Sequence, residues 1–176
     1  INLRAVRALS KDATKPDIGK VRVGTFLKGL VSSLWSWMPE GVTLNFSIID
    51  SSIDIWTNKD SLHSILVNLV KNSVESIGGH GTISVNYNID PEYSNIEFII
   101  SDSGPGFRSE QLEQLNIGSP IGSSKKEGHG LGLLTVILLT KELNGDLHFS
   151  NDESGHANIK VWIPSSPNTD TEATFI

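Results

Sequence analysis

Three groups of residues have the types and spacing needed to bind a nucleotide. Asn68 and Asn72 stand four positions apart in a stretch with helical apolar periodicity, so both amides face one side of a helix and could hold a cation or phosphate oxygens. Asp102 follows the β-branched run 96–100, which places its carboxylate at a strand end, where it can accept from an exocyclic amine. We therefore expect a metal and phosphate end and an adenine end.

Two glycine runs accompany these polar residues. Gly104 and Gly106 lack Cβ atoms beside Asp102, so a flat ring could approach the backbone there. The second run opens the apolar helix expected over 131–143, whose free N–H groups would meet an anion. It consists of Gly128, Gly130 and Gly132.

Each group also has an ordinary structural interpretation. The Asn pair alone is typical of a polar stripe on a helix, and the composition of 102–106 is typical of a turn. The second glycine run follows the polar stretch 122–127 instead of a strand, which argues against a Rossmann site, and no P-loop motif is present. The ordered combination, more than any one motif, indicates a nucleotide site.

The three motifs resemble those of the catalytic ATP-binding domain of sensor histidine kinases, in the GHKL (Bergerat-fold) ATPase superfamily. Residues 66–77 are similar to the N box, 102–107 to the G1 box and 123–133 to the G2 box. Residues 144–164 are similar to the closing segment of that domain. The resemblance covers residues from about 20 to 165.

The resemblance implies a role for each motif. Asn72 would coordinate a Mg²⁺ ion that bridges the phosphates of ATP, with Asn68 helping from one turn earlier, and Asp102 would bind the adenine amino group. Mg²⁺ and a lysine of the G2 box would offset repulsion between the triphosphate and a chain of net charge −6. The other implied ATP-binding positions are Ser76, Gly104, Gly106, Ser124, Lys125, Gly128, His129, Gly130, Leu131, Gly132 and Leu133; Lys126 fits an ordinary surface equally well.

Three positions depart from the common pattern of these kinases. Glu75 stands three residues after the metal Asn, where many members have a basic residue. The Phe-rich F box is barely visible in 115–121, and Ala157 stands in a segment where Gly-Thr is common. We expect these departures to affect the ATP lid, predicted near 103–128, and nucleotide affinity more than the fold.

A phosphoacceptor histidine is not recognisable in the chain. Histidine kinases transfer the γ-phosphate to a His on a helical dimerisation domain, typically followed by Glu or Asp. The five histidines here, His63, His80, His129, His148 and His156, are followed by Ser, Gly, Gly, Phe and Ala. Residues 1–10 resemble the last turns of the missing domain, so the chain is expected to be part of a longer protein, and no catalytic residue is assigned in it.

The resemblance leaves two alternatives besides a histidine kinase domain. One is a Ser/Thr kinase of the anti-sigma type, which shares the fold. The other is a degenerate GHKL module that binds nucleotide weakly and regulates a partner. Direct ATP hydrolysis is not expected, because hydrolytic relatives carry a Glu where this chain has Asn68, an amide that cannot take a proton from water.

Composition is compatible with one globular domain. The chain has 176 residues, 38% of them hydrophobic, and no cysteine, which excludes disulfides and thiol chemistry. The acidic balance without a basic cluster argues against nucleic acid, and the apolar run near 131–139 is too short to span a bilayer. We expect a cytoplasmic domain without direct membrane contact, whose parent protein could be anchored in the inner membrane. Its expected partners are the phosphoacceptor domain of the same protein and a response regulator receiver domain.

The periodicities predict a two-layer α/β sandwich of the Bergerat type, with a mixed sheet covered on one face by helices and a mobile ATP lid. Helices are expected over 24–37, 58–77 and 129–143, and strands over 42–49, 53–56, 82–89, 96–100, 146–150 and 157–163. The expected divisions are 1–19 as the end of a dimerisation helix and linker, 20–164 as the catalytic domain, and 165–176 as a disordered tail.

Trp35 and Trp37 lie about 200° apart around their helix. One should pack in the core and the other face solvent, where it could dock the missing helical domain.

Overall fold

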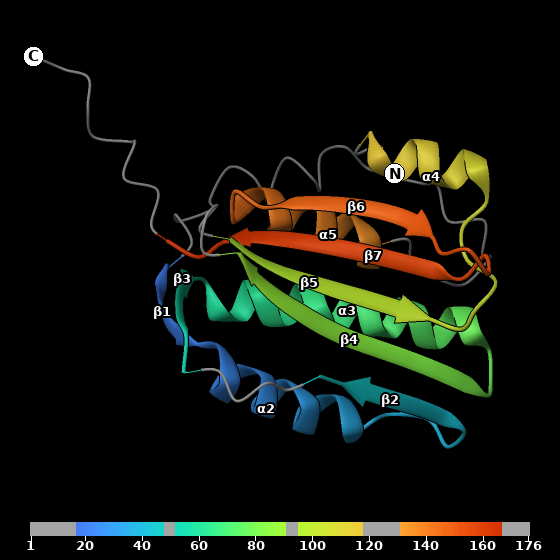
Figure 1. The fold of residues 1–176 in the computed structure, drawn as a ribbon, viewed down its shortest axis with the longest axis horizontal. Coiled ribbons are helices and arrows are strands. Elements are labelled where there is room, and N and C mark those ends of the chain that lie inside the picture. The colour runs from blue at the N-terminus through green and yellow to red at the C-terminus, as the bar shows by residue number, and fades with distance from the viewer. Residues whose placement is uncertain (1–16, 48–51, 91–94, 118–130, 167–176) are drawn as a thin grey trace, which may run out of the picture.

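The computed structural model describes residues 17–47, 52–90, 95–117 and 131–166. A five-stranded sheet in the order β2-β4-β5-β7-β6 forms one layer, and helices cover one of its faces (Figure 1). Its strands are β2 (Val42–Phe46), β4 (Gly81–Asp90), β5 (Asn95–Asp102), β6 (Asp146–Asn151) and β7 (Ala157–Pro164). β2 runs parallel to β4 and the other neighbours are antiparallel, which confirms the predicted mixed sheet.

Three helices correspond to the predicted ones. They are α2 (Val23–Trp35), α3 (Lys59–Ile77) and α5 (Leu131–Glu142). In the view of Figure 1, α3 and α5 lie behind the sheet and pack against each other, and α2 contacts α3. The Asn58 side chain caps α3 by accepting from the Ser61 N–H at 2.8 Å, and Gly78 ends the helix with a left-handed φ of +66°. No helix in the described parts of the chain is long and apolar enough to cross a membrane.

Strand alternation decides which side chains of β5 face the helices. Ile96, Phe98, Ile100 and Asp102 alternate as buried positions along the strand, with the residues between them half-buried. The apolar side of α3, which includes the fully buried Leu62, Ile65, Leu66 and Leu69, packs against the same core. The strand that builds the core therefore also carries the Asp102 carboxylate to the helix side of the sheet.

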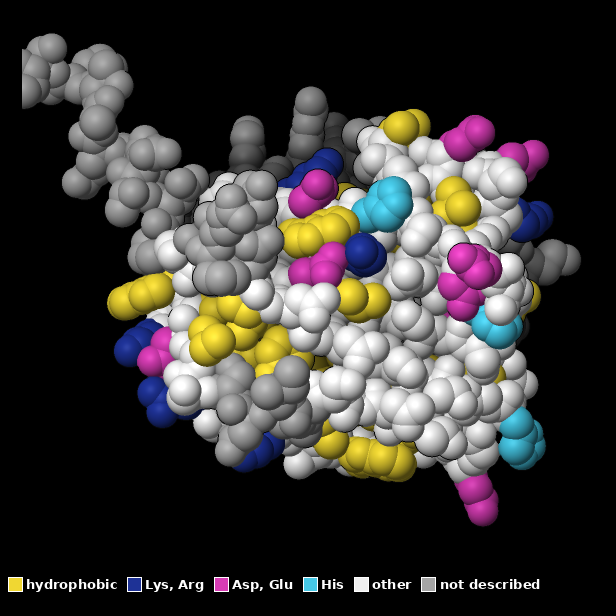
Figure 2. Space-filling model, viewed as in Figure 1, with side chains coloured by type: hydrophobic (Ala, Val, Ile, Leu, Met, Phe, Trp, Pro, Cys, Tyr) yellow, Lys and Arg dark blue, Asp and Glu magenta, His cyan; other side chains and the backbone are white. Residues whose placement is uncertain are grey.

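The opposite face of the sheet is polar. One row across all five strands consists of Asn45, Ser84, Ser101, Asn158 and Ser150, each paired with the next in the ladder. Figure 2 shows this face as mainly uncharged polar side chains and backbone, with a few apolar and charged groups between them. The sheet is thus wet on one side, as the alternating strands predicted.

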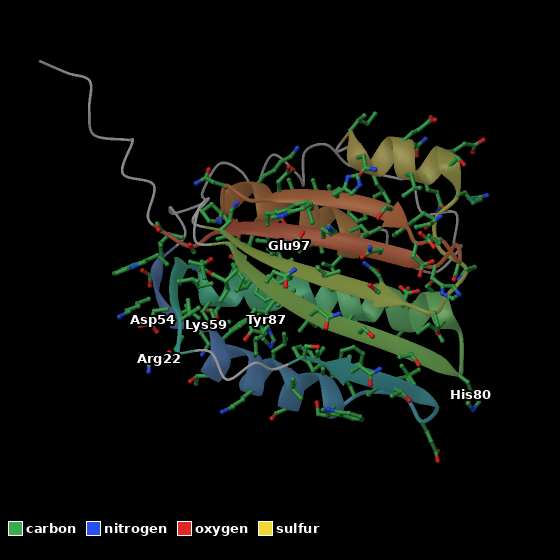
Figure 3. All side chains as sticks on the ribbon, viewed as in Figure 1. Arg22, Asp54, Lys59, His80, Tyr87 and Glu97 are labelled. Carbon is green, nitrogen blue, oxygen red and sulfur yellow. The ribbon has the colours of Figure 1, made fainter. Side chains whose placement is uncertain are left out.

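A separate two-stranded sheet joins β1 (Gly19–Arg22) to β3 (Asp54–Thr57). The Arg22 guanidinium donates to both oxygens of the Asp54 carboxylate at 3.0 and 3.3 Å (Figure 3). Lys20 Nζ lies 2.9 Å from Asp54 Oδ2. The hydrogen bonds from Arg22 and then Lys20 lower the pKa of Asp54 from 3.8 to about 2. The backbone N–H of Trp56 donates to the Ser165 carbonyl, which ties the end of β7 to this small sheet.

The Asp54 cluster predicts a pH-dependent contribution to stability. Because the pKa of Asp54 is lower in the folded chain, its stabilisation is complete above about pH 4 and is lost as the pH falls toward 2. We expect Asp54→Asn to unfold at a lower temperature than the native chain at pH 7, with the difference shrinking toward pH 2 and at high salt. Thermal unfolding across this pH range measures it; a difference independent of pH would contradict this origin.

Two elements were not predicted, and part of the expected lid is helical. α4 (Ser109–Asn116) occupies the first half of the region expected to be a mobile lid, beside β6 in Figure 1, and no helix was predicted there. The Gln111 side chain supports the start of α4 by accepting from the Arg108 N–H at 2.9 Å. β1 was also missed. The rest of the lid, residues 1–16 and residues 167–176 lie outside the described part of the chain.

The two tryptophans divide as expected. Trp35 is 54% exposed at the end of α2. Trp37 is partly buried against the core, with the Lys71 ammonium 5.7 Å from its ring centroid. Trp35 is therefore the one whose indole is available to a partner.

Candidate functional site

Asp102 lies at the end of β5 with 6% of its surface exposed. Its Oδ1 atom accepts the backbone N–H of Gly104 at 2.9 Å, so the carboxylate fixes the start of the glycine-containing turn that follows. A buried carboxylate held in this way has a defined direction. It can recognise a donor group by position, which a solvated aspartate on a loop could not do.

Gly104 lies where β5 meets α3. A Cβ atom at this position would stand 2.7 Å from the Ser76 hydroxyl oxygen and 2.8 Å from Asp102 Oδ1, closer than real Cβ contacts. Ser76, near the end of α3, and Asp102 therefore converge on the same turn. This juxtaposition brings together three of the residues that the motifs implied.

Gly106 is required by both its conformation and its surroundings. Its φ is +69°, in the left-handed region, and a Cβ atom would collide with the Gly155 carbonyl oxygen and lie 2.7 Å from Asn151 Oδ1. The turn after Asp102 thus rests directly against the loop between β6 and β7. A side chain at this position would push the turn away from the sheet.

The Asn pair faces the beginning of α5. A Cβ atom at Gly132 would lie 3.3 Å from Asn72 Oδ1 and 3.6 Å from Asn68 Oδ1, so both amide oxygens point toward this glycine. Asn68 Nδ2 donates to the Ser64 carbonyl at 2.7 Å, whereas the buried Asn72 Nδ2 has no hydrogen-bond partner among the residues described. Oxygen ligands at this place suit Mg²⁺, and an unpartnered buried amide suits a bound polar ligand.

The remaining predicted site residues are only partly described. Leu131 is the first residue of α5, and Leu133 is partly buried against the core, so its side chain has a packing role. Ser124, Lys125, Lys126, Gly128, His129 and Gly130 lie outside the described residues. Their assignment to the phosphate end stays a prediction.

Two asparagines that the motifs did not single out bind backbone groups at the two ends of the segment that follows the Asp102–Gly106 turn. Asn151, the last residue of β6, bonds the backbone of Phe107, and Asn116, the last residue of α4, bonds the backbone of Phe149. Neither belongs to a periodic pattern or to the N, G1 or G2 box. Asn116 does lie in the segment where the F box is barely visible, which was the one available signal.

A groove of about 410 Å³ lies elsewhere, between β1, α2 and the start of α3. Lys59 and His63 line it, and none of the Asn pair, Asp102 or the glycines of the turn does. His63 is partly exposed, as expected for an ordinary helix residue. The groove is not the predicted nucleotide site.

Comparison with known proteins gives a consistent result. Residues 57–167 match the family model described as histidine kinase-, DNA gyrase B-, and HSP90-like ATPase. The chain is 32% identical over 123 residues to the sensor histidine kinase ZraS of Escherichia coli O157:H7, an alignment that covers 70% of this chain and 26% of ZraS. It therefore spans about a quarter of the length of that relative.

Solved structures show the same fold. The catalytic domain of histidine kinase ThkA superposes with a TM-score of 0.73 at 21% identity, covering 86% of this chain and 97% of the domain. ThkA in complex with the response regulator protein TrrA also gives a TM-score of 0.73, at 16% identity, covering 95% of this chain and 47% of that one. At these identities the likeness concerns the fold alone.

Proposed function

Because this chain belongs to the family of histidine kinase-, DNA gyrase B- and HSP90-like ATPases and is a catalytic ATP-binding domain of the sensor histidine kinase type, we propose that it binds Mg²⁺-ATP and presents the γ-phosphate to a histidine of a separate helical domain. One observation carries the proposal: Asp102, Gly104 and Ser76 meet where β5 ends beside α3, and the Asn72 and Asn68 oxygens, one and two turns earlier on α3, lie beside Gly132 at the start of α5. These are the elements that hold the three motifs.

The base end of the site would use Asp102. Its Oδ1 atom is engaged by Gly104, so the carboxylate is already oriented when a base arrives and loses little conformational freedom on binding. The exocyclic amine of adenine donates to a carboxylate, whereas the carbonyl of guanine at the equivalent position would be repelled by it. We therefore expect a preference for adenine nucleotides.

The phosphate end would use the Asn pair. Asn72, with Asn68 one turn earlier, would supply amide oxygens to Mg²⁺, whose chemistry is to neutralise phosphate charge as the γ-phosphoryl group is transferred. Gly132 leaves room between these amides and the helix N-terminus. Lys125 of the G2 box would add a positive charge.

The receiving groups would belong to other domains. We place the phosphoacceptor histidine on the helical dimerisation domain of the same protein and the final acceptor aspartate on a response regulator receiver domain. The similarity to ThkA, whose structure contains the response regulator TrrA, supports the second partner. A domain that consumes ATP for signalling is expected in the cytoplasm.

The test is binding followed by transfer. Calorimetric titration of the native chain with ATP and Mg²⁺ should show one site. The chain should then label a separately produced phosphoacceptor domain from γ-labelled ATP, and it should release little free phosphate, because Asn68 stands where a hydrolytic base would be needed. Binding without transfer would favour the anti-sigma type, and absence of binding would favour a degenerate regulatory module.

Exposed Trp35 provides a prediction about the phosphoacceptor domain. It is 54% exposed on α2, and a large aromatic side chain of this kind is a common anchor in interfaces. We expect Trp35→Ala to reduce phosphoryl transfer to the acceptor domain by about tenfold, with unchanged ATP affinity of the isolated chain. A matched loss of affinity would show that the substitution acts on the domain itself and would overturn this docking role.

A further inference from the structure

We call residues 102–106 the base turn, because Asp102 would bind the nucleobase. Two asparagine side chains hold the segment between this turn and the end of α4. Asn151 Oδ1 accepts the Phe107 N–H and Asn151 Nδ2 donates to the Phe107 carbonyl, both at 2.8 Å. Asn116 forms the same pair of bonds with Phe149, both at 2.9 Å. Each amide therefore binds both polar backbone groups of one residue, as a neighbouring strand would.

The Asn151 bonds lie at the base turn itself. Phe107 directly follows Gly106, whose backbone approaches Asn151 Oδ1 so closely that a Cβ atom would lie 2.7 Å from it. The Phe107 ring packs edge-on against Phe149, with centroids 5.8 Å apart. The exit of the turn is thus fixed by one amide and one ring contact, and both come from β6.

The entry of the turn is fixed from the other side. There, Asp102 Oδ1 accepts the Gly104 N–H. Between these two anchors stand two glycines, the residues with the greatest backbone freedom. If the exit were released, the turn would gain conformations in which the Gly104 N–H and the Asp102 carboxylate no longer face each other.

We propose that Asn151 is a positioning residue for the base-binding site: by holding both backbone groups of Phe107, it keeps the Asp102–Gly106 turn in the shape that orients the Asp102 carboxylate. The inference rests on the proposed function for the identity of the ligand. An amide suits this place because the carboxamide of Asn or Gln offers a donor and an acceptor side by side in one planar group, and Asn has the shorter reach.

Asn116 supplies a matched control. It makes the same number and kind of hydrogen bonds, in the same segment, but at the far end of α4 and to the backbone of β6. Asn116→Ala and Asn151→Ala should therefore lower the free energy of unfolding by similar amounts. Only Asn151→Ala should disturb the base turn.

The first measurement needs no nucleotide. Amide hydrogen exchange of the native chain and both variants reports the Gly104 N–H, which Asn151 does not touch. We expect exchange at Gly104 to rise about tenfold in Asn151→Ala beyond the increase caused by global destabilisation, and to follow global stability alone in Asn116→Ala. Equal protection of Gly104 in the two variants would overturn the proposal.

The second measurement concerns the ligand. We expect Asn151→Ala to bind ATP about tenfold more weakly and to lose preference for ATP over GTP, whereas Asn116→Ala keeps the native preference. A native preference in the Asn151 variant would overturn the positioning role. If the native chain bound no ATP but Gly104 still exchanged faster in Asn151→Ala, the proposed function would fail while the hold of Asn151 on the turn would stand.

Discussion

Asp102→Ala is expected to abolish measurable ATP binding in a chain that still folds. The substitution removes the acceptor for the base amine and also the acceptor for the Gly104 N–H. A hydrogen bond to a charged group contributes about 1.5–3 kcal/mol, so the loss of base recognition together with turn order should weaken binding by about 100-fold or more. Calorimetry with ATP and Mg²⁺, beside circular dichroism of the same sample, measures both properties.

Asp102→Asn is the informative companion variant. It keeps the size of the side chain and one oxygen for Gly104, but it replaces the charged acceptor with an amide. We expect an intermediate loss of ATP affinity and a smaller loss of stability than in the alanine variant. Native affinity in Asp102→Ala would mean that the base binds elsewhere in the fold.

Asn72→Leu should separate function from stability. The buried Asn72 Nδ2 has no partner among the described residues, and a leucine of similar volume would remove that desolvated group. Phosphoryl transfer should fall by about 100-fold or more, because the variant loses a preorganised oxygen at the metal and phosphate end. The midpoint of urea unfolding should stay the same or rise.

The measurements for this variant are transfer from γ-labelled ATP and equilibrium unfolding without nucleotide. Asn68→Leu is the control, since Asn68 Nδ2 already donates to the Ser64 carbonyl. Compared with Asn72→Leu, it should lower the free energy of unfolding more and reduce phosphoryl transfer less. Unchanged transfer by Asn72→Leu across a range of Mg²⁺ concentrations would exclude Asn72 as a ligand.

Patterns that continue over many residues made the fold predictable. α3 runs for 19 residues with buried positions at helical spacing, and β5 alternates over its whole length, so each element stands out from single-residue noise. α4 has only eight residues and a single buried side chain, Leu115, which is too little apolar pattern to recognise. β1 has four residues and pairs with β3, a partner distant in sequence that a local pattern cannot reveal.

The site was predictable to the extent that motifs encode it. The residues flanking Asp102 and Gly104 lie close together in sequence, so the turn could be foreseen from composition. The approach of Ser76 to Gly104, and of Gly155 and Asn151 to Gly106, depends on packing between segments that are distant in the sequence. Side-chain amides that bond distant backbone groups have no period and no sequence signature, so structure alone reveals them.

The Asn116 amide has a consequence for the outer border of the sheet. β6 is the last strand in the order, and an edge strand exposes N–H and C=O groups on which another chain could assemble. At Phe149 both of these groups are already taken by Asn116. The helix α4 therefore covers two backbone groups of this edge strand that a strand of another chain would need for pairing at Phe149.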